Sequence, residues 1–323
     1  MALRHRKRQK TGLFHTVLVQ SLRSSSDILH LAHIVIIIDV IHTLEHSLKR
    51  VSDGDLMQRY HTLPKNLSFL KPRRVGDLIR CGRNGDGGYV FPLFILDQVD
   101  AIVSFGLGTD FSFETCVHYK KPGLTVHAYD NSVDSKVLLS WCLVGLVKLI
   151  IGHSSIEEFK ARIFVYKQYQ NLFKQNNTHF HERVFNRIDR SEDVTIDTVM
   201  ARLPNSSCLM VKIDIEGTEY RIIPHMKDYF DKIALLIIEF HDTSILRHLF
   251  EKCVKGIQES FEIVHLHANN CSGVAPDGLP DILEITFLHK RFSITHELQN
   301  SLPLKGLDFP NDPMKPDIIL HFE

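Results

Sequence analysis

Two short runs that are almost entirely apolar, CLMVKID (208–214) and IALLIIEF (233–240), constrain the fold of this chain more than any other feature. Strands of a parallel sheet covered by helices on both faces have such continuous apolar sequences. The segment between them, residues 217–230, predicts a helix that Pro224 should kink or shorten. Strand, helix and strand make a βαβ unit, so we expect an α/β fold with a parallel sheet.

Other segments extend this sheet in both directions along the chain. IVSF (102–105) and LTVHAYD (124–130) predict earlier strands, and FEIVHLH (261–267) and ILEITFLH (282–289) predict two late ones. The loop between the late strands is too short for a long helix, so this pair should be antiparallel. We therefore expect a Rossmann-like, mostly parallel doubly wound sheet that ends in an antiparallel strand pair. Residues 157–173 predict a further helix and 179–185 a further strand.

Charge and cysteine usage exclude some classes of protein. The 323 residues include 38 Lys and Arg and 38 Asp and Glu, so the formal net charge is zero. Nucleic-acid binding through bulk positive charge is therefore not expected. The six cysteines form no CxxC pair, which argues against a zinc ribbon or a thioredoxin motif.

The first part of the chain resembles a signal anchor in layout. The basic stretch RHRKRQK (4–10) precedes an apolar stretch at 28–44, and membrane association through this stretch is one of two interpretations. Asp39 and three histidines interrupt that stretch, so an amphipathic or buried helix is the alternative. Glycosylation sequons begin at Asn66, Asn176, Asn205 and Asn270. Localisation stays open between a secretory or membrane-anchored protein and a cytoplasmic one.

A glycine loop follows the first predicted strand of the sheet. In SFGLGTDFSFE (104–114), Gly106 and Gly108 allow a sharp turn and a close approach to a ligand. Phe111 stands where a dinucleotide fingerprint has its third glycine. Asp130 ends the next strand, at about the 20-residue offset of an acid that binds ribose hydroxyls. Together these residues predict an adenosine-containing ligand, and the alternatives are a plain turn and a helix cap.

Charged side chains crowd the ends of the two most apolar runs. Lys212, Asp214 and Glu216 follow one strand, and Glu239 and His241 end the other. Ligands of open α/β sheets bind at this edge, and buried charges are costly unless they are paired or used. The group predicts a proton relay, with metal ligands or a structural ion pair as alternatives. Only one histidine and no cysteine join the carboxylates, so we expect no metal.

Two loops contain further candidate binding residues. In HLHANN (265–270), His267, Asn269 and Asn270 offer several hydrogen bonds in one turn, although loop capping by Asn is the simpler interpretation. In NGDGGY (84–89), the glycines and Tyr89 predict either a flap over the site or a plain hairpin turn.

These segments together resemble the FkbM-type methyltransferase domain. FGLGTD, VHAYD, LMVKIDIEGTEY and LLIIEFHD occur in that family's order and spacing, and KIDIEG followed by the I-E-F-H strand is the most specific part. CGRNGDGGYVF, HLHANN with LPDILEITF, and LDFPNDP further resemble the animal and bacterial FkbM-like branch. The resemblance covers residues 75–320 and leaves 1–60 as an N-terminal extension.

The resemblance implies an S-adenosylmethionine-dependent O-methyltransferase that acts on a hydroxyl of a small molecule or glycan. It places Gly106, Gly108 and Asp130 at the cofactor. We expect His241 to be the catalytic base, with Asp214 as second choice and Glu239 beside them. The expected substrate-binding residues are Glu216, Tyr89, His267 and Asn269. The alternatives are a non-catalytic protein that retains the fold and, less favoured, a nicotinamide-dependent oxidoreductase.

Overall fold

The computed structural model describes residues 59–174, 176–292 and 297–323. The apolar stretch at 28–44, which the sequence left open between a membrane anchor and an amphipathic or buried helix, lies outside the described residues. The chain divides into two compact units, one containing residues 132–170 and the other residues 56–131 and 171–323. The sequence-based boundaries at 60 and 75 stay a prediction.

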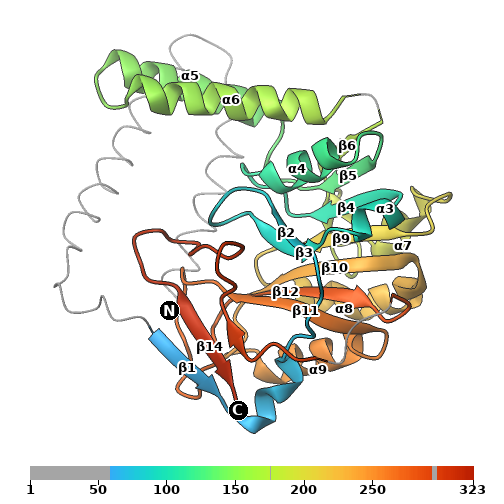
Figure 1. Ribbon diagram of the computed structural model, residues 1–323. Coiled ribbons are helices and arrows are strands. Elements are labelled where there is room, and N and C mark those ends of the chain that lie inside the picture. The colour runs from blue at the N-terminus through green and yellow to red at the C-terminus, as the bar shows by residue number, and fades with distance from the viewer. Residues whose placement is uncertain (1–58, 175, 293–296) are drawn as a thin grey trace. The chain divides into compact units, whose positions relative to one another are not determined.

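The larger unit is built on a seven-stranded sheet (Figure 1). Its strand order is β11-β12-β10-β9-β4-β5-β6. The strands are β4 (Ala101–Phe105), β5 (Thr125–Tyr129), β6 (Thr178–Phe180), β9 (Leu209–Ile213), β10 (Ile233–Phe240), β11 (Phe261–Ala268) and β12 (Leu283–His289). Neighbouring strands are parallel except that β12 runs antiparallel to both β10 and β11. The predicted Rossmann-like sheet with an antiparallel pair at its end is confirmed.

The strands predicted from apolar runs form where expected, with one exception. Residues 179–185 do not make one strand. They contribute to β6 and to β7 (Arg183–Val184), which leaves the main sheet to pair with β8 (Asp193–Val194). The prediction of a single strand at 179–185 is therefore wrong, and the chain turns between the two pieces.

The crossover helix between β9 and β10 is shortened as Pro224 predicted. It consists of α8 (Glu219–Met226) followed by the 3-10 helix η2 (Lys227–Lys232). Pro224 lies inside α8 and has no N–H to donate to the preceding turn. Ile222, Ile223 and Met226 keep the apolar face of this short helix buried against the sheet.

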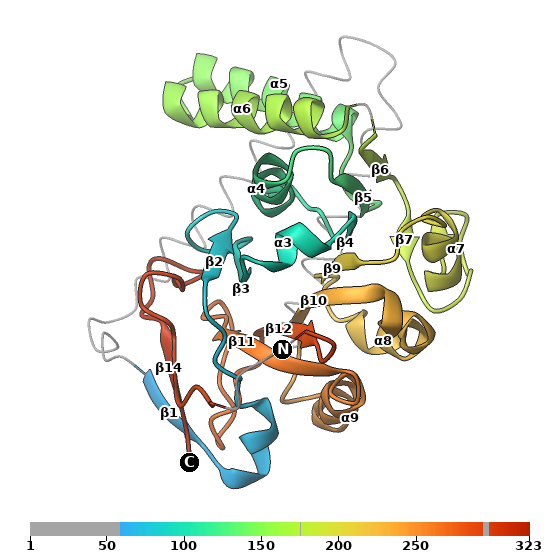
Figure 2. The same cartoon turned by 45° about the vertical axis from the view of Figure 1, so that its right-hand side comes forward.

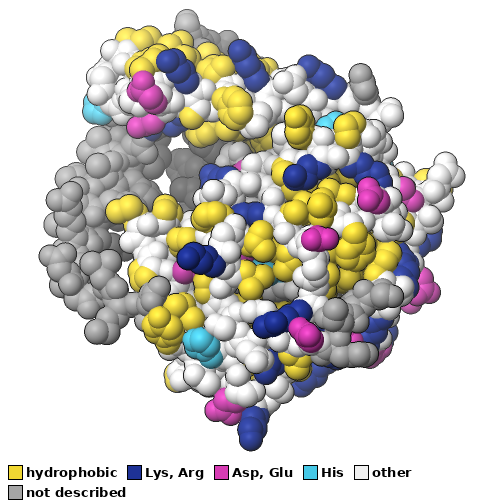
Figure 3. Space-filling view, viewed as in Figure 1, with side chains coloured by type: hydrophobic (Ala, Val, Ile, Leu, Met, Phe, Trp, Pro, Cys, Tyr) yellow, Lys and Arg dark blue, Asp and Glu magenta, His cyan; other side chains and the backbone are white. Residues whose placement is uncertain are grey.

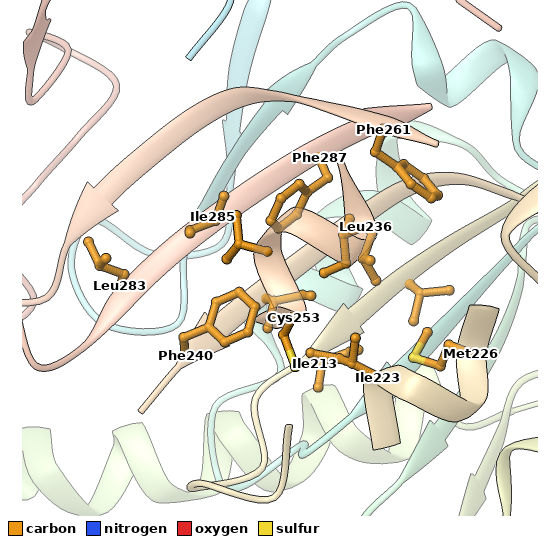
Figure 4. Close-up of a cluster of buried hydrophobic side chains, with 14 of the residues drawn as sticks. Ile213, Ile223, Met226, Leu236, Phe240, Cys253, Phe261, Leu283, Ile285 and Phe287 are labelled. Atoms are coloured by element: carbon orange, nitrogen blue, oxygen red, sulfur yellow. The ribbon is translucent and has the colours of Figure 1, made fainter. Parts of the chain in front are cut away.

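One face of the sheet packs against helices to form the main core. Figure 4 shows Ile213, Leu236 and Phe240 of the sheet beside Ile223 of α8 and Cys253 of α9. The helices α7 (Ile196–Ala201), α8 and α9 (Arg247–Ile257) lie on this face (Figure 2). Because alternate residues of a strand point to opposite faces, the residues between these core positions point to the other side.

The other face carries a hairpin and two short helices. The hairpin strands are β2 (Leu78–Cys81) and β3 (Tyr89–Pro92), and the helices are α3 (Ile95–Gln98) and α4 (Ser112–Lys120). The Thr286 hydroxyl of β12 donates to the Val90 carbonyl and ties β3 to this face. Lys212 and Glu239 alternate with the core residues of β9 and β10, so they point toward the hairpin. The residues NGDGG (84–88) lie in the turn that connects β2 and β3, and Tyr89 is the first residue of β3.

The two ends of the larger unit meet in a small separate sheet. The strand β1 (Arg59–Leu63) pairs in parallel with β14 (Ile318–Phe322), and β13 (Ser301–Leu302) pairs antiparallel with β14. The 3-10 helix η1 (Lys65–Leu70) follows β1 and buries Leu67 and Leu70 in the main core. All six cysteines are free thiols.

The described part of the smaller unit is a helix pair, α5 (Ser135–Ile150) and α6 (Ile156–Leu172). The latter confirms the helix predicted over 157–173. Asp134 caps α5 by accepting a bond of 2.7 Å from the Val137 N–H. Figure 3 shows apolar side chains on the surface of this pair, and Leu143, Ile150 and Phe164 are among the exposed ones. No helix within the described residues is long and apolar enough to cross a membrane.

Candidate functional site

The glycine loop after β4 packs against the end of the neighbouring strand β9. Gly106 has a φ of +80°, and a Cβ on it would lie 1.6 Å from the Asp214 carbonyl oxygen. Gly106 is therefore required by the backbone of the next strand, whereas the sequence suggested a close approach to a ligand. Gly108 also has a positive φ, of +58°, but a Cβ there would meet nothing within 4 Å. Only Gly108 faces open space in which a ligand could approach.

Asp130 lies directly beside this loop, at the end of β5. Its Oδ2 accepts hydrogen bonds of 2.8 Å from the Leu107 N–H and 2.7 Å from the Gly108 N–H. The three residues predicted to hold the cofactor are thus in one place. The backbone N–H groups of Leu107 and Gly108, together with the Asp130 carboxylate that they bind, form a cradle at the carboxyl ends of two parallel strands.

Lys212 connects this cradle to the residues after β9. Its buried Nζ donates a bond of 2.6 Å to the Gly106 carbonyl and lies 3.5 Å from Asp214 Oδ2. Burial by itself lowers the pKa of Lys212, but the charges of Asp214, Glu114 and Glu239 raise it on balance. A permanent positive charge therefore sits between the glycine loop and the carboxylates.

Asp214, Glu239 and His241 come together at the ends of β9 and β10. His241 Nε2 lies 3.9 Å from Asp214 Oδ1, 3.7 Å from Glu239 Oε1 and 3.9 Å from Glu216 Oε2. Glu239 and His241 are buried, whereas the Glu216 side chain is 69% exposed at the rim. His241 thus lies on the same sheet edge as Gly106 and Asp130, linked to them through Asp214 and Lys212.

Glu219 at the start of α8 orients His241, and the sequence did not single it out. This fully buried carboxylate accepts a bond of 3.0 Å from His241 Nδ1 and bonds of 3.1 and 3.2 Å from the Ile215 and Gly217 N–H groups. Burial lowers the pKa of His241, but the hydrogen bond to Glu219 and the surrounding carboxylates raise it to about 10. A histidine with that pKa carries its proton at neutral pH and does not readily accept another.

A second glutamate that the sequence did not single out is Glu114 in α4. It is fully buried and accepts a bond of 2.5 Å from the Ser104 hydroxyl of β4. Burial raises the pKa of Glu114, while the charge of Lys212 lowers it. Neither Glu114 nor Glu219 could be identified from sequence, because acidic residues in a helix are normally exposed.

Tyr89 and Asn269, which we predicted to bind substrate, contact the cluster. The Tyr89 hydroxyl lies 3.2 Å from Asp214 Oδ2 and 3.4 Å from Glu239 Oε2. Asn269 Nδ2 donates a bond of 3.0 Å to Glu239 Oε1. Burial, followed by the charges of Asp214 and Glu284, raises the pKa of Glu239 well above its ordinary value.

His267 and Asn270 instead bind the C-terminal segment. His267 is 1% exposed, with Nδ1 3.2 Å from Glu284 and Nε2 3.2 Å from Asp317. The Asn270 side chain donates to backbone carbonyls of residues 312, 315 and 316. Both side chains are already engaged inside the protein, and the sequon at Asn270 is buried.

The site occupies the point where the strand order of the sheet reverses. β4 has β5 on one side and β9 on the other, so the chain leaves β4 in one direction and returns to its opposite side. Ligands of open α/β sheets bind at this crevice, outside the carboxyl ends of the strands. Gly106, Asp130, Asp214 and His241 all follow strands at this edge.

Comparison with known proteins finds remote likenesses in structure alone. The chain matches no protein-family model and no curated protein. A precorrin-6y C5,15-methyltransferase from Geobacter metallireducens is 10% identical, over 61% of this chain and 86% of that one, with a TM-score of 0.32. A putative RNA methyltransferase from Pyrococcus horikoshii is 13% identical, over 58% and 74%, with a TM-score of 0.29.

A third solved structure, a putative class I S-adenosylmethionine-dependent methyltransferase from Listeria monocytogenes, is 13% identical, over 68% and 63%, with a TM-score of 0.31. The chain's own strand order, with antiparallel β12 between β10 and β11, is that of a Rossmann-like, mostly parallel sheet. Because likenesses this remote reveal nothing about substrate, the function has to be inferred from the chain's own side chains.

Proposed function

We propose that this protein is an S-adenosylmethionine-dependent methyltransferase of the FkbM-like branch, which methylates a hydroxyl oxygen of a small molecule or glycan. The observation that carries the proposal is the position of Lys212. Its side chain contacts the Gly106 carbonyl and lies beside Asp214, so the glycine-loop cradle and the carboxylate cluster lie together at one edge of the sheet. A transferase for a cofactor-borne group needs this adjacency, because donor and acceptor must meet.

The loop and Asp130 fit the cofactor. The open space at Gly108 leaves room for a ligand against the backbone, and Asp130 is the acid expected to accept bonds from ribose hydroxyls. Asp130 now binds the Leu107 and Gly108 N–H groups through Oδ2, so it is held in place beside that space. We assign cofactor binding to Gly106, Gly108 and Asp130.

The cluster would act on the acceptor hydroxyl. Bound S-adenosylmethionine would supply an electrophilic methyl group on a sulfonium, whose C–S electron pair returns to sulfur on transfer. The chain must hold the acceptor oxygen in line with that methyl, an effect on the order of 7–11 kcal/mol. The hydroxyl proton passes to one of the carboxylates of the cluster, Asp214 and Glu239, because His241 already carries its proton. Among these, Asp214 is open to solvent on one side and lies nearest the glycine loop through Lys212.

The rim of the cluster is suited to a polar acceptor. The Glu216 carboxylate is exposed, and the Tyr89 hydroxyl and the Asn269 amide lie against the cluster. Carboxylates accept hydrogen bonds from hydroxyls, so a polyhydroxylated acceptor such as a sugar can be oriented by several of them. We keep Glu216, Tyr89 and Asn269 as proposed substrate-binding residues, and we withdraw His267, because both of its ring nitrogens are engaged by Glu284 and Asp317.

Ligand binding and methyl transfer test the proposal together. Titration calorimetry should give saturable binding of S-adenosylmethionine and none of NAD, and labelled cofactor should transfer its methyl group to one of a panel of sugars and hydroxylated small molecules. Binding of NAD alone would favour an oxidoreductase. Absence of binding by either ligand, in a protein that melts cooperatively, would favour a non-catalytic protein with this fold.

A further inference from the structure

Three side chains direct one donor atom each toward a common point. Among the described residues, Asp214, Glu239 and His241 form a group whose ligand atoms all lie within 4.8 Å of one another. His241 Nε2 is 3.9 Å from the Asp214 oxygen and 3.7 Å from the Glu239 oxygen. These separations are too long for hydrogen bonds. Two tetrahedral ligands of one ion, each bound at about 2.0–2.2 Å, lie about 3.3–3.6 Å apart, so an inward shift of a few tenths of an ångström would let these atoms share one ion.

The imidazole ring of His241 is oriented by a hydrogen bond from its second nitrogen, as is usual for a histidine that binds a metal. The residue is 8% exposed, its Nδ1 is bound to the buried carboxylate of Glu219, and its Nε2 has carboxylate oxygens at 3.7–3.9 Å. A histidine that ligates a metal through one nitrogen almost always donates its other N–H to a carboxylate or carbonyl. The Glu219 contact therefore fixes the ring and leaves Nε2 directed at the two carboxylates.

We propose that Asp214, Glu239 and His241 bind a divalent transition-metal cation, such as Mn²⁺ or Zn²⁺. One imidazole nitrogen with carboxylate oxygens is a donor set for these ions, whereas Ca²⁺ prefers oxygen alone. The charge of a divalent cation also balances the negative charge gathered here. The sequence had led us to expect no metal because a single histidine was visible, and the supporting role of Glu219 emerges only in the fold.

Neighbouring groups hold the two carboxylates in position for such an ion. Asn269 donates to the Glu239 oxygen that faces His241, and the Tyr89 hydroxyl lies within 3.4 Å of the remaining oxygens of Glu239 and Asp214. Outer contacts of this kind orient metal ligands. Glu216, with Oε2 3.9 Å from His241 Nε2 and an exposed side chain, can supply a further ligand.

The simpler alternative is an imidazolium paired with the carboxylates and no metal. Charge-assisted N–H···O bonds are about 2.7–2.9 Å long, and each of the three Nε2 distances to a carboxylate exceeds that by nearly 1 Å. The geometry therefore suits an ion between the donor atoms better than a direct contact. Whether the site binds a cation does not depend on the proposed function.

The catalytic role of the cation does rest on the proposed function: the ion would hold the acceptor hydroxyl oxygen and favour loss of the hydroxyl proton.

The test is a titration of the chelator-treated full chain with MnCl₂, followed by electron paramagnetic resonance and calorimetry, with ZnSO₄ in competition. We expect one Mn²⁺ per chain, binding at least tenfold weaker in Asp214→Asn and His241→Asn, and binding roughly 10–100-fold weaker in Glu219→Gln. The matched control is His225→Asn, which removes an exposed histidine of α8 and should leave Mn²⁺ affinity unchanged.

The outcomes distinguish failure of the cation site from failure of the proposed methyltransferase function. Stoichiometric Mn²⁺ binding that all the site variants retain, or no binding to the folded wild type, would overturn the cation site. Because Asp214 is partly exposed, Asp214→Asn should fold even if the buried variants do not, and thermal melts verify this. S-adenosylmethionine affinity is measured in excess EDTA. Cofactor binding without Mn²⁺ binding refutes only the cation site, whereas Mn²⁺ binding without cofactor binding refutes only the methyltransferase.

Discussion

Alanine at Gly106 and at Gly108 should have very different effects, although both glycines belong to one loop and both have positive φ. At Gly106 the new Cβ would lie 1.6 Å from the Asp214 carbonyl oxygen, and real Cβ contacts are essentially never below 3.0 Å. Backbone must therefore move by more than 1 Å. Overpacking costs about 1–3 kcal/mol or more, and a left-handed alanine about 1–2 kcal/mol. Gly106→Ala should thus destabilise the protein by roughly 2–5 kcal/mol.

At Gly108 only the cost of a left-handed alanine applies, because a Cβ there meets nothing within 4 Å and causes no overpacking. The expected loss is about 1–2 kcal/mol, or roughly 2–8 °C in melting temperature for a unit of this size. Gly123 is the matched control, since its φ is +89°, it also has nothing within 4 Å, and it lies in the turn before β5. Gly123→Ala should melt like Gly108→Ala.

The assay combines differential scanning calorimetry with titration of S-adenosylmethionine. Gly106→Ala should melt far below the other two variants or fail to fold. Gly108→Ala should bind the cofactor more weakly because its methyl group enters the cradle, and Gly123→Ala should bind it normally. A Gly106→Ala protein that melts like wild type would refute the packing argument, and equal cofactor affinity in Gly108→Ala and Gly123→Ala would remove the loop from the cofactor site.

Three further predictions concern cofactor binding by Asp130, the loss of stability at low pH through Asp308, and residues 28–44. Asp130→Ala should weaken S-adenosylmethionine binding by about 1–3 kcal/mol, measured by calorimetry, and unchanged affinity would remove this residue from the site. Burial raises the pKa of Asp308, but His265 lowers it to about 2, so its stabilisation of about 2 kcal/mol is present above pH 3.8 and lost as pH falls toward 2. Urea melts should show a steeper loss over pH 4–2 in wild type than in Asp308→Asn, and parallel curves would contradict this. If residues 28–44 anchor the chain, it should sediment with membranes and shift in mobility on glycosidase treatment, whereas a soluble, unshifted protein would exclude the secretory hypothesis. The sequons that the structure leaves exposed for such glycans begin at Asn66, Asn176 and Asn205.

The strands of the sheet could be predicted closely because a strand that is buried on both faces consists of consecutive apolar residues. Residues 233–240 form β10 with the predicted bounds, since eight consecutive positions are buried on both faces. Pro224 predicted a short crossover helix, because a proline removes a hydrogen bond of its own helix and this effect does not depend on distant residues. The segment 179–185 was harder to predict, because its second half leaves the main sheet to pair with β8, and this pairing is not visible in the segment itself.

The candidate site was predictable only in part. Asp214, Glu239 and His241 could be placed at one sheet edge, because strand ends in a parallel sheet share an edge and charges there are unexpected. Glu219 could not be identified, since a glutamate in a helix gives no sign that it is fully buried beneath a histidine. The sequence also suggested His241 as a base. Burial lowers the pKa of His241, but the hydrogen bond to Glu219 and the surrounding carboxylates raise it to about 10, so the ring carries its proton at neutral pH.

By itself, the sequence determined the element types, the parallel sheet with its antiparallel end, and the edge at which chemistry could occur. These depend on local apolar periodicity and on where polar residues interrupt it. The tertiary structure decided which groups meet across that edge. It placed Tyr89 from a hairpin over the carboxylates, made Gly106 a packing requirement of β9, and set Glu219 behind His241. Such contacts depend on strand order and side-chain direction, which residues far apart in the chain establish only when they fold together.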